Sequence, residues 1–113
     1  MIGGYIAAVV TPFKDGKVDV ESFEKYMNYM VGSGISGMVV CGSTGESLSL
    51  TMQEKVEFVK IASRINSNRT KLFAGVIDAS TQNCLELVKN TEEYVDGFLC
   101  VCPFYVKPSQ EQI

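Results

Sequence analysis

Short apolar runs alternate with amphipathic stretches at intervals of about 30 residues along this chain. The apolar runs begin near residues 5, 38, 72 and 98. Their apolar residues are consecutive, which is typical of strands that are buried on both faces of a parallel sheet. The stretches between them carry apolar residues at helical spacing. The repeat therefore predicts βα units that build a parallel sheet.

Each of the three predicted helices begins at a side chain that can accept a hydrogen bond from a free backbone N–H. Asp19 is placed to cap the first helix, which ends at the glycines of residues 32–34. Residues 51–54 (TMQE) have the pattern of a capping box and open the second helix. Ser80 or Thr81 opens the third helix.

Two architectures are compatible with this repeat. In a (β/α)₈ barrel, the four runs would be the first four strands of a domain of roughly 250 residues. A small doubly wound sheet could be nearly complete within 113 residues, so the length alone favours it. No linker or low-complexity stretch divides residues 1–113, and we predict that they belong to a single domain.

The composition excludes several classes of site and partner. These residues contain no histidine, which removes histidine-dependent catalytic triads and histidine-ligated metal sites from this segment. The net charge of −3 gives no electrostatic reason to expect nucleic acid or an anionic membrane as a partner. The longest apolar runs are far shorter than the roughly 20 residues of a membrane-spanning helix. No secretory leader is visible, so we expect a cytoplasmic protein.

The four cysteines are Cys41, Cys84, Cys100 and Cys102, and they lack the C-x-x-C spacing of a zinc or redox site. Without a secretory leader, we expect them to be reduced thiols that are buried as small apolar side chains.

Residues 42–47 (GSTGES) follow the second predicted strand, at the end where α/β proteins bind their ligands. Two glycines flank two adjacent hydroxyl groups, so the backbone can turn sharply and present N–H and O–H groups together. Such a nest suits a small anion, either a carboxylate or a phosphate. The segment is not a P-loop, because no Gly-Lys-Ser/Thr follows. An ordinary βα turn is the alternative.

Residues 103–110 (PFYVKPSQ) follow the fourth predicted strand. Two prolines restrict this segment, so Tyr105 is expected to be held in place. A tyrosine there can relay a proton if another hydroxyl lies within hydrogen-bond reach, although packing is the commoner role. Lys107 lies on the same segment and is expected to be solvated.

Together with residues 7–13 (AAVVTPF), these two segments resemble the dihydrodipicolinate synthase family of class I pyruvate-dependent aldolases and lyases. Their order and spacing fit over essentially the whole chain, which would cover roughly the first two-fifths of a barrel enzyme. The resemblance therefore implies a (β/α)₈ TIM barrel, of which this chain supplies about the first four strands and three helices.

The resemblance also implies an activity. Family members bind pyruvate as a Schiff base on a lysine and condense it with aspartate β-semialdehyde. The product is 4-hydroxy-tetrahydrodipicolinate, in lysine biosynthesis through diaminopimelate. No cofactor or metal is implied, and the expected assembly is a homodimer or homotetramer.

Three residues match functional positions of the family. Ser43 falls where the family usually has the threonine of a proton relay, and it would contact the substrate as well. Thr44 matches the position that holds the pyruvate carboxylate, and Tyr105 matches a relay tyrosine inserted into the neighbouring subunit's site. The Schiff-base lysine lies on a later strand and has no counterpart here, since Lys107 matches a loop position. We therefore expect residues 1–113 to be inactive alone, as part of a longer enzyme.

Two further expectations follow from the resemblance. Some family members bind lysine as an inhibitor. The residues of this chain at or near those places are Met52, Lys55, Ala79, Asn83 and Phe104. The positive charge of Lys55 and its apolar neighbours do not favour a lysine ligand, so feedback inhibition by lysine is not expected. The alternatives to the synthase are an N-acetylneuraminate or keto-deoxy-sugar lyase of the same superfamily, or a non-catalytic truncated remnant.

Overall fold

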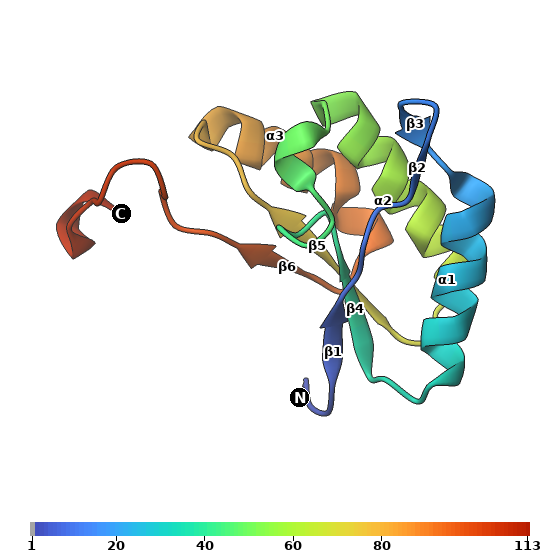
Figure 1. Ribbon diagram of the computed structural model, residues 1–113. Helices are drawn as coiled ribbons and strands as arrows, with labels where there is room; N and C mark the ends of the chain where they lie inside the picture. Colours follow the sequence, from blue (N-terminus) through green and yellow to red (C-terminus); the bar gives the residue numbers. More distant parts are fainter. Residues whose placement is uncertain (1) are drawn as a thin grey trace.

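The computed structural model describes residues 2–113, and its centre is a parallel sheet of four strands (Figure 1). The strands are β1 (Ile6–Ala8), β4 (Gly37–Val40), β5 (Lys71–Val76) and β6 (Gly97–Cys100). They lie side by side in chain order, and all three pairings are parallel. A doubly wound sheet reverses its strand order at a switch point, whereas a barrel does not. The strand order therefore decides against the doubly wound alternative.

Three helices connect the strands: α1 (Val20–Gly32), α2 (Met52–Asn66) and α3 (Thr81–Thr91). All three cover the same face of the sheet (Figure 1). Sequential strands with helices on one face are the arrangement expected of the first four strands and three helices of a (β/α)₈ barrel.

The predicted helix starts are confirmed, with one difference. Asp19 accepts a hydrogen bond from Ser22 N at 3.1 Å, and Ser80 caps α3 by accepting one from Asn83 N at 3.3 Å. Thr51 accepts a bond from Glu54 N at 3.2 Å. The reciprocal half of the capping box is absent, because the Glu54 carboxylate accepts from the Thr51 hydroxyl at 3.1 Å.

The core lies between the sheet and the helices. Alternate residues of the strands direct their side chains into this core. The helices α1 and α2 contact each other there through a pair of aromatic rings. The centroids of Phe23 and Phe58 are 4.4 Å apart. The buried strand residues that join this core are Met38, Val40, Leu72 and Ala74. β4 is buried along its whole length, as its unbroken apolar run predicts.

A short hairpin between β1 and α1 was not predicted. β2 (Phe13–Lys14) pairs with β3 (Lys17–Val18) in antiparallel fashion. Asp15 and Gly16 join them with φ angles of 53° and 76°, the positive values that a tight two-residue hairpin turn requires. The Asp-Gly signal in the sequence thus marks a turn, but strands of two residues are too short to show a pattern.

The prediction for the cysteines is partly wrong. All four are free and Cys41 is buried, but Cys84 is half-buried, and Cys100 and Cys102 are exposed. Within residues 2–113, β6 is one of the two edge strands of the sheet, and no fourth α-helix follows it to cover these thiols. Among these residues, no helix is long and apolar enough to cross a membrane.

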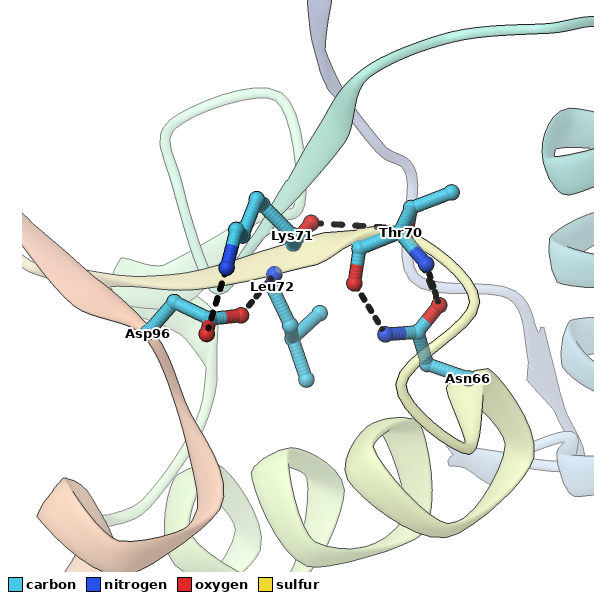
Figure 2. Close-up of polar contacts among 5 residues, drawn as sticks. All are labelled: Asn66, Thr70, Lys71, Leu72 and Asp96. Atoms are coloured by element: carbon cyan, nitrogen blue, oxygen red, sulfur yellow. Dashed lines mark hydrogen bonds and ion pairs between the residues drawn. The ribbon is translucent and has the colours of Figure 1, made fainter. Parts of the chain in front are cut away.

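At the amino ends of the strands, the polar groups bond to one another (Figure 2). Asn66, which is buried, donates to Thr70 O at 2.8 Å and accepts from the Thr70 hydroxyl at 2.9 Å and the Thr70 N–H at 3.3 Å. The Asp96 carboxylate accepts from Leu72 N at 2.9 Å and lies 3.6 Å from Lys71 Nζ. These contacts connect the end of α2 to the starts of β5 and β6.

Candidate functional site

The candidate site is residues 42–47, called here the 42–47 loop, which leaves the carboxyl end of β4. The backbone turns at Cys41 and again at Glu46, both with φ of 56°. Such left-handed conformations are uncommon for residues other than glycine and cluster at functional sites. Within the loop, Ser43 O accepts from Glu46 N at 3.0 Å, and Gly42 O accepts from Ser47 N at 3.2 Å. The loop is thus a compact, internally bonded turn.

The segment that follows β1 supports this loop on one side. Thr11 is buried, and its hydroxyl donates to Gly45 O at 2.7 Å. A Cβ at Gly45 would lie 3.1 Å from Val9 O and 3.2 Å from Thr11 Oγ1, so a larger residue would have to displace these groups. Glycine at this position therefore allows the loop to rest against the segment after β1.

β5 supports the loop on the other side. A Cβ at Gly75 would overlap the backbone carbonyl of Cys41 and lie 2.9 Å from Gly42 Cα. Only a residue without a side chain lets the start of the loop pass this closely over the neighbouring strand. The geometry of the loop thus depends on the segment after β1 and on β5.

The loop presents two hydroxyl groups to solvent and buries a third. Ser43 and Thr44, the two predicted substrate-binding residues, are adjacent and exposed. Ser47 is fully buried, and within residues 2–113 its hydroxyl has no hydrogen-bond partner. A surface with adjacent hydroxyls and a tightly turned backbone can donate several hydrogen bonds to a carboxylate.

The charge of Lys55 acts on two ionisable groups, Cys41 directly before the loop and Asp78 beyond β5. Lys55 of α2 is only 4% exposed, and its ammonium donates to Ile77 O, 3.5 Å away. Burial raises the pKa of the Cys41 thiol to about 12, although the Lys55 charge acts in the opposite direction. The backbone N–H of Ser80 lowers the pKa of Asp78, assisted by other hydrogen bonds and by Lys55. Cys41 is therefore a neutral thiol at physiological pH.

Tyr105 is not brought to the loop within one chain. It is 92% exposed and belongs to the segment after β6, which leads away from the sheet (Figure 1). Lys107, on the same segment, is also exposed. The structure therefore places Ser43 and Thr44 together, while the predicted part of Tyr105 in a neighbouring subunit's site stays a prediction.

Sequence reasoning did not find Thr11, Gly75 and Lys55 as contributors to this region. The Thr11 hydroxyl bonds to a residue 34 positions away, and no local pattern indicates such a partner. A signal for Lys55 does exist, because it lies one helical turn before the buried residues Phe58 and Val59 and so shares their face.

Comparisons with known proteins agree with this geometry. A family model described as the dihydrodipicolinate synthetase family matches residues 1–113. The 4-hydroxy-tetrahydrodipicolinate synthase of Thermosipho africanus (strain TCF52B) is 38% identical over 111 residues, which cover 97% of this chain and 38% of that protein.

Solved structures give the same result. The 4-hydroxy-tetrahydrodipicolinate synthase of Methylacidiphilum fumariolicum SolV matches with a TM-score of 0.95 and 37% identity, over 99% of this chain and 38% of that one. A structure described as the first monomeric dihydrodipicolinate synthase variant matches with a TM-score of 0.90 and 36% identity, over 96% of this chain and 37% of that one. These matches confirm the expected fold class, and the chain spans 37–38% of the length of the relatives named here.

Proposed function

We propose that this chain, which belongs to the dihydrodipicolinate synthetase family, is the substrate-carboxylate-binding portion of a Schiff-base-forming lyase. The complete enzyme condenses pyruvate with aspartate β-semialdehyde to 4-hydroxy-tetrahydrodipicolinate, on the way to lysine through diaminopimelate. Residues 1–113 supply hydroxyl groups and backbone N–H groups, and a later part of the barrel supplies the lysine that forms the imine. The segment alone is inactive, because the covalent step then has no amine in place.

The observation that carries this proposal is the 42–47 loop. Its two exposed hydroxyls, on Ser43 and Thr44, stand at the carboxyl edge of a parallel sheet. The segment after β1 and the strand β5 fix its backbone, through the Thr11 hydroxyl and through the close approach at Gly75. A preorganised set of donors binds an anion better than a mobile one, because less ordering is needed on binding.

In this proposal, the two hydroxyl residues have separate roles. Thr44 and the turned backbone hold the pyruvate carboxylate, so that the keto carbon faces the lysine. Ser43 contacts the substrate and carries protons to and from the reacting atoms as a relay hydroxyl. This division agrees with the loop geometry, in which both side chains are exposed on one short turn.

Tyr105 completes the relay in a neighbouring subunit. Its 92% exposure and its place on an outward-leading segment support a role outside its own chain (Figure 1). The assembly would then be at least a dimer. Because one similar structure is described as a monomeric variant, the assembly state needs its own measurement by mass.

Borohydride reduction in the presence of pyruvate tests the function. The full-length protein should gain one pyruvate adduct per chain, located by peptide mass spectrometry on a lysine beyond residue 113. Residues 1–113 alone should gain none. An adduct on Lys107, or no adduct on the full-length protein, would contradict the proposal and support, respectively, another nucleophile or a non-catalytic remnant.

The second substrate separates the synthase from the alternative lyases. The pyruvate-loaded enzyme should turn over with aspartate β-semialdehyde and not with N-acetylmannosamine or a sugar aldehyde. The lysine, proline, serine and glutamine at residues 107–110 resemble the synthase more than the lyases, where this stretch tends to be aromatic. Turnover with the sugar substrates alone would assign the chain to the lyases.

A further inference from the structure

Lys55 is the one charged side chain that is buried among residues 2–113. Burying an ammonium group is costly unless an opposite charge compensates it. Neither of the two ion pairs within these residues, Lys25–Glu21 and Lys71–Asp96, includes it. Its only hydrogen bond there is the long one of 3.5 Å to the carbonyl of Ile77. A buried positive charge with so little compensation requires an explanation.

Asp78 compensates this charge only from a distance, through the same attraction by which Lys55 lowers the pKa of Asp78. Its two carboxylate oxygens accept hydrogen bonds from Ser80 N at 2.8 Å and from Asn83 Nδ2 at 3.2 Å. It forms no ion pair within 4 Å with Lys55. The Asp78 carboxylate is thus held by the start of α3.

The Lys55 ammonium is connected to the start of the 42–47 loop through the end of β5. Ile77, which accepts its hydrogen bond, is two residues beyond Gly75, and the Gly75 backbone packs against Cys41 and Gly42. The Lys55 charge also acts on the Cys41 thiol, the residue directly before the loop. The positive charge is therefore held against the segment that supports the start of the loop, on a side chain that is only 4% exposed.

We infer that Lys55 supplies a fixed positive charge through which the 42–47 loop selects an anionic substrate. This inference rests on the proposed function and extends it to specificity. Lys55 does not touch the substrate. It is a positioning residue whose charge favours a carboxylate on the loop over an uncharged group of the same shape. Because the carboxylate is present in both the ground state and the transition state, the charge should lower KM and leave kcat unchanged.

The test uses Lys55→Met in the full-length protein, since methionine keeps an apolar stem and removes the charge. The apparent KM for pyruvate should rise about tenfold, with kcat within about twofold of the parent. Methyl pyruvate, which has no charge, should show the same half-saturating concentration for borohydride trapping in both proteins. Lys60→Met removes an exposed lysine from the same helix and should change neither value.

Each result decides the inference. If pyruvate and methyl pyruvate both bind more weakly by the same factor, Lys55 has only a structural role. If the KM for pyruvate is unchanged, the Lys55 charge does not contribute to substrate binding. Lys55→Gln repeats the measurement if the methionine variant does not fold. If the parent protein traps no pyruvate, the proposed function fails and this inference fails with it, whereas trapping with an unaffected Lys55→Met overturns this inference alone.

Discussion

The amino edge of the parallel sheet, where its strands begin, and the carboxyl edge, where they end, use their polar groups in opposite ways. At the amino edge, Asn66, Thr70, Lys71 and Asp96 bond to one another and to the backbone (Figure 2). At the carboxyl edge, the hydroxyls of Ser43 and Thr44 face solvent, the Ser47 hydroxyl has no partner within residues 2–113, and Lys55 is buried without an ion pair. Groups at the first edge are bonded within the chain, whereas at the second edge the Ser43 and Thr44 hydroxyls are available for a ligand.

Left-handed backbone conformations occur at both edges, since Ser67 and Asn68 at the amino edge also have positive φ angles, of 47° and 59°. On the carboxyl side, Cys41 and Glu46 adopt left-handed conformations in succession around the 42–47 loop, although neither is a glycine. Strain of this kind persists only where surrounding contacts hold it, here Thr11 and Gly75. In barrels of this type, the carboxyl edge carries the active site and the amino edge carries stability. The comparison therefore predicts that substitutions at the two edges will separate turnover from stability.

The largest effect is expected at Ser43. Ser43→Ala removes one exposed hydroxyl and little packing, so the melting temperature should stay within a degree or so of the parent. Loss of an acid–base partner should lower kcat by about 10²–10⁴-fold, while borohydride still traps the pyruvate imine. Steady-state kinetics of the full-length protein measure kcat, and borohydride trapping detects the imine.

Two variants serve as controls for this prediction. Ser43→Thr keeps the hydroxyl and should retain most activity, and Ser49→Ala removes an exposed serine just beyond the loop and should change nothing. A turnover number unchanged by Ser43→Ala would remove Ser43 from the relay.

A smaller effect, on stability alone, is expected at Asn66. Asn66→Ala leaves the Thr70 backbone and hydroxyl groups without their buried partner, and the free energy of unfolding should fall by about 2 kcal/mol. Urea denaturation measures this change, and kcat should be unaffected. The matched control is Asn28→Ala, which loses only an exposed contact with Arg69 and should cost much less. A fall in kcat without a loss of stability would contradict the division between the edges.

Much of the fold was predictable because its signals are local. Asp19, Thr51 and Ser80 mark the helix starts, since a cap depends only on residues three positions away. The unbroken apolar run of β4 marks a strand buried on both faces. The choice between barrel and doubly wound sheet was not local, because it depends on the order in which distant strands pair.

The site was predictable only in part, for a similar reason. The composition of residues 42–47 indicates a turn with exposed hydroxyls, and the structure has one. The supports of this turn come from Thr11 and Gly75, each more than 30 positions away from the residue that it contacts. The exposure of Cys100 and Cys102 also escaped prediction, because it depends on β6 being an edge strand.

The smallest expected effect sharpens the comparison most, because Thr11 is a saturated group at the carboxyl edge. Thr11→Val keeps the shape of the side chain but removes the 2.7 Å hydrogen bond to Gly45 O, and the free energy of unfolding should fall by about 1 kcal/mol. If this bond holds the loop in its binding conformation, the half-saturating pyruvate concentration should rise as well, by up to about fivefold.

Thr91→Val provides the matched control for this last prediction. Thr91 is also buried, and its hydroxyl also donates to a backbone carbonyl, that of Leu87 at 2.6 Å, but it lies within α3 and away from the loop. The control should lose a similar or smaller amount of stability, with no change in pyruvate saturation. If both variants lose stability alone, Thr11 has the same structural role as Asn66 at the opposite edge. The 42–47 loop would then keep its binding conformation without the Thr11 hydroxyl, and the close approach at Gly75 would be its main support.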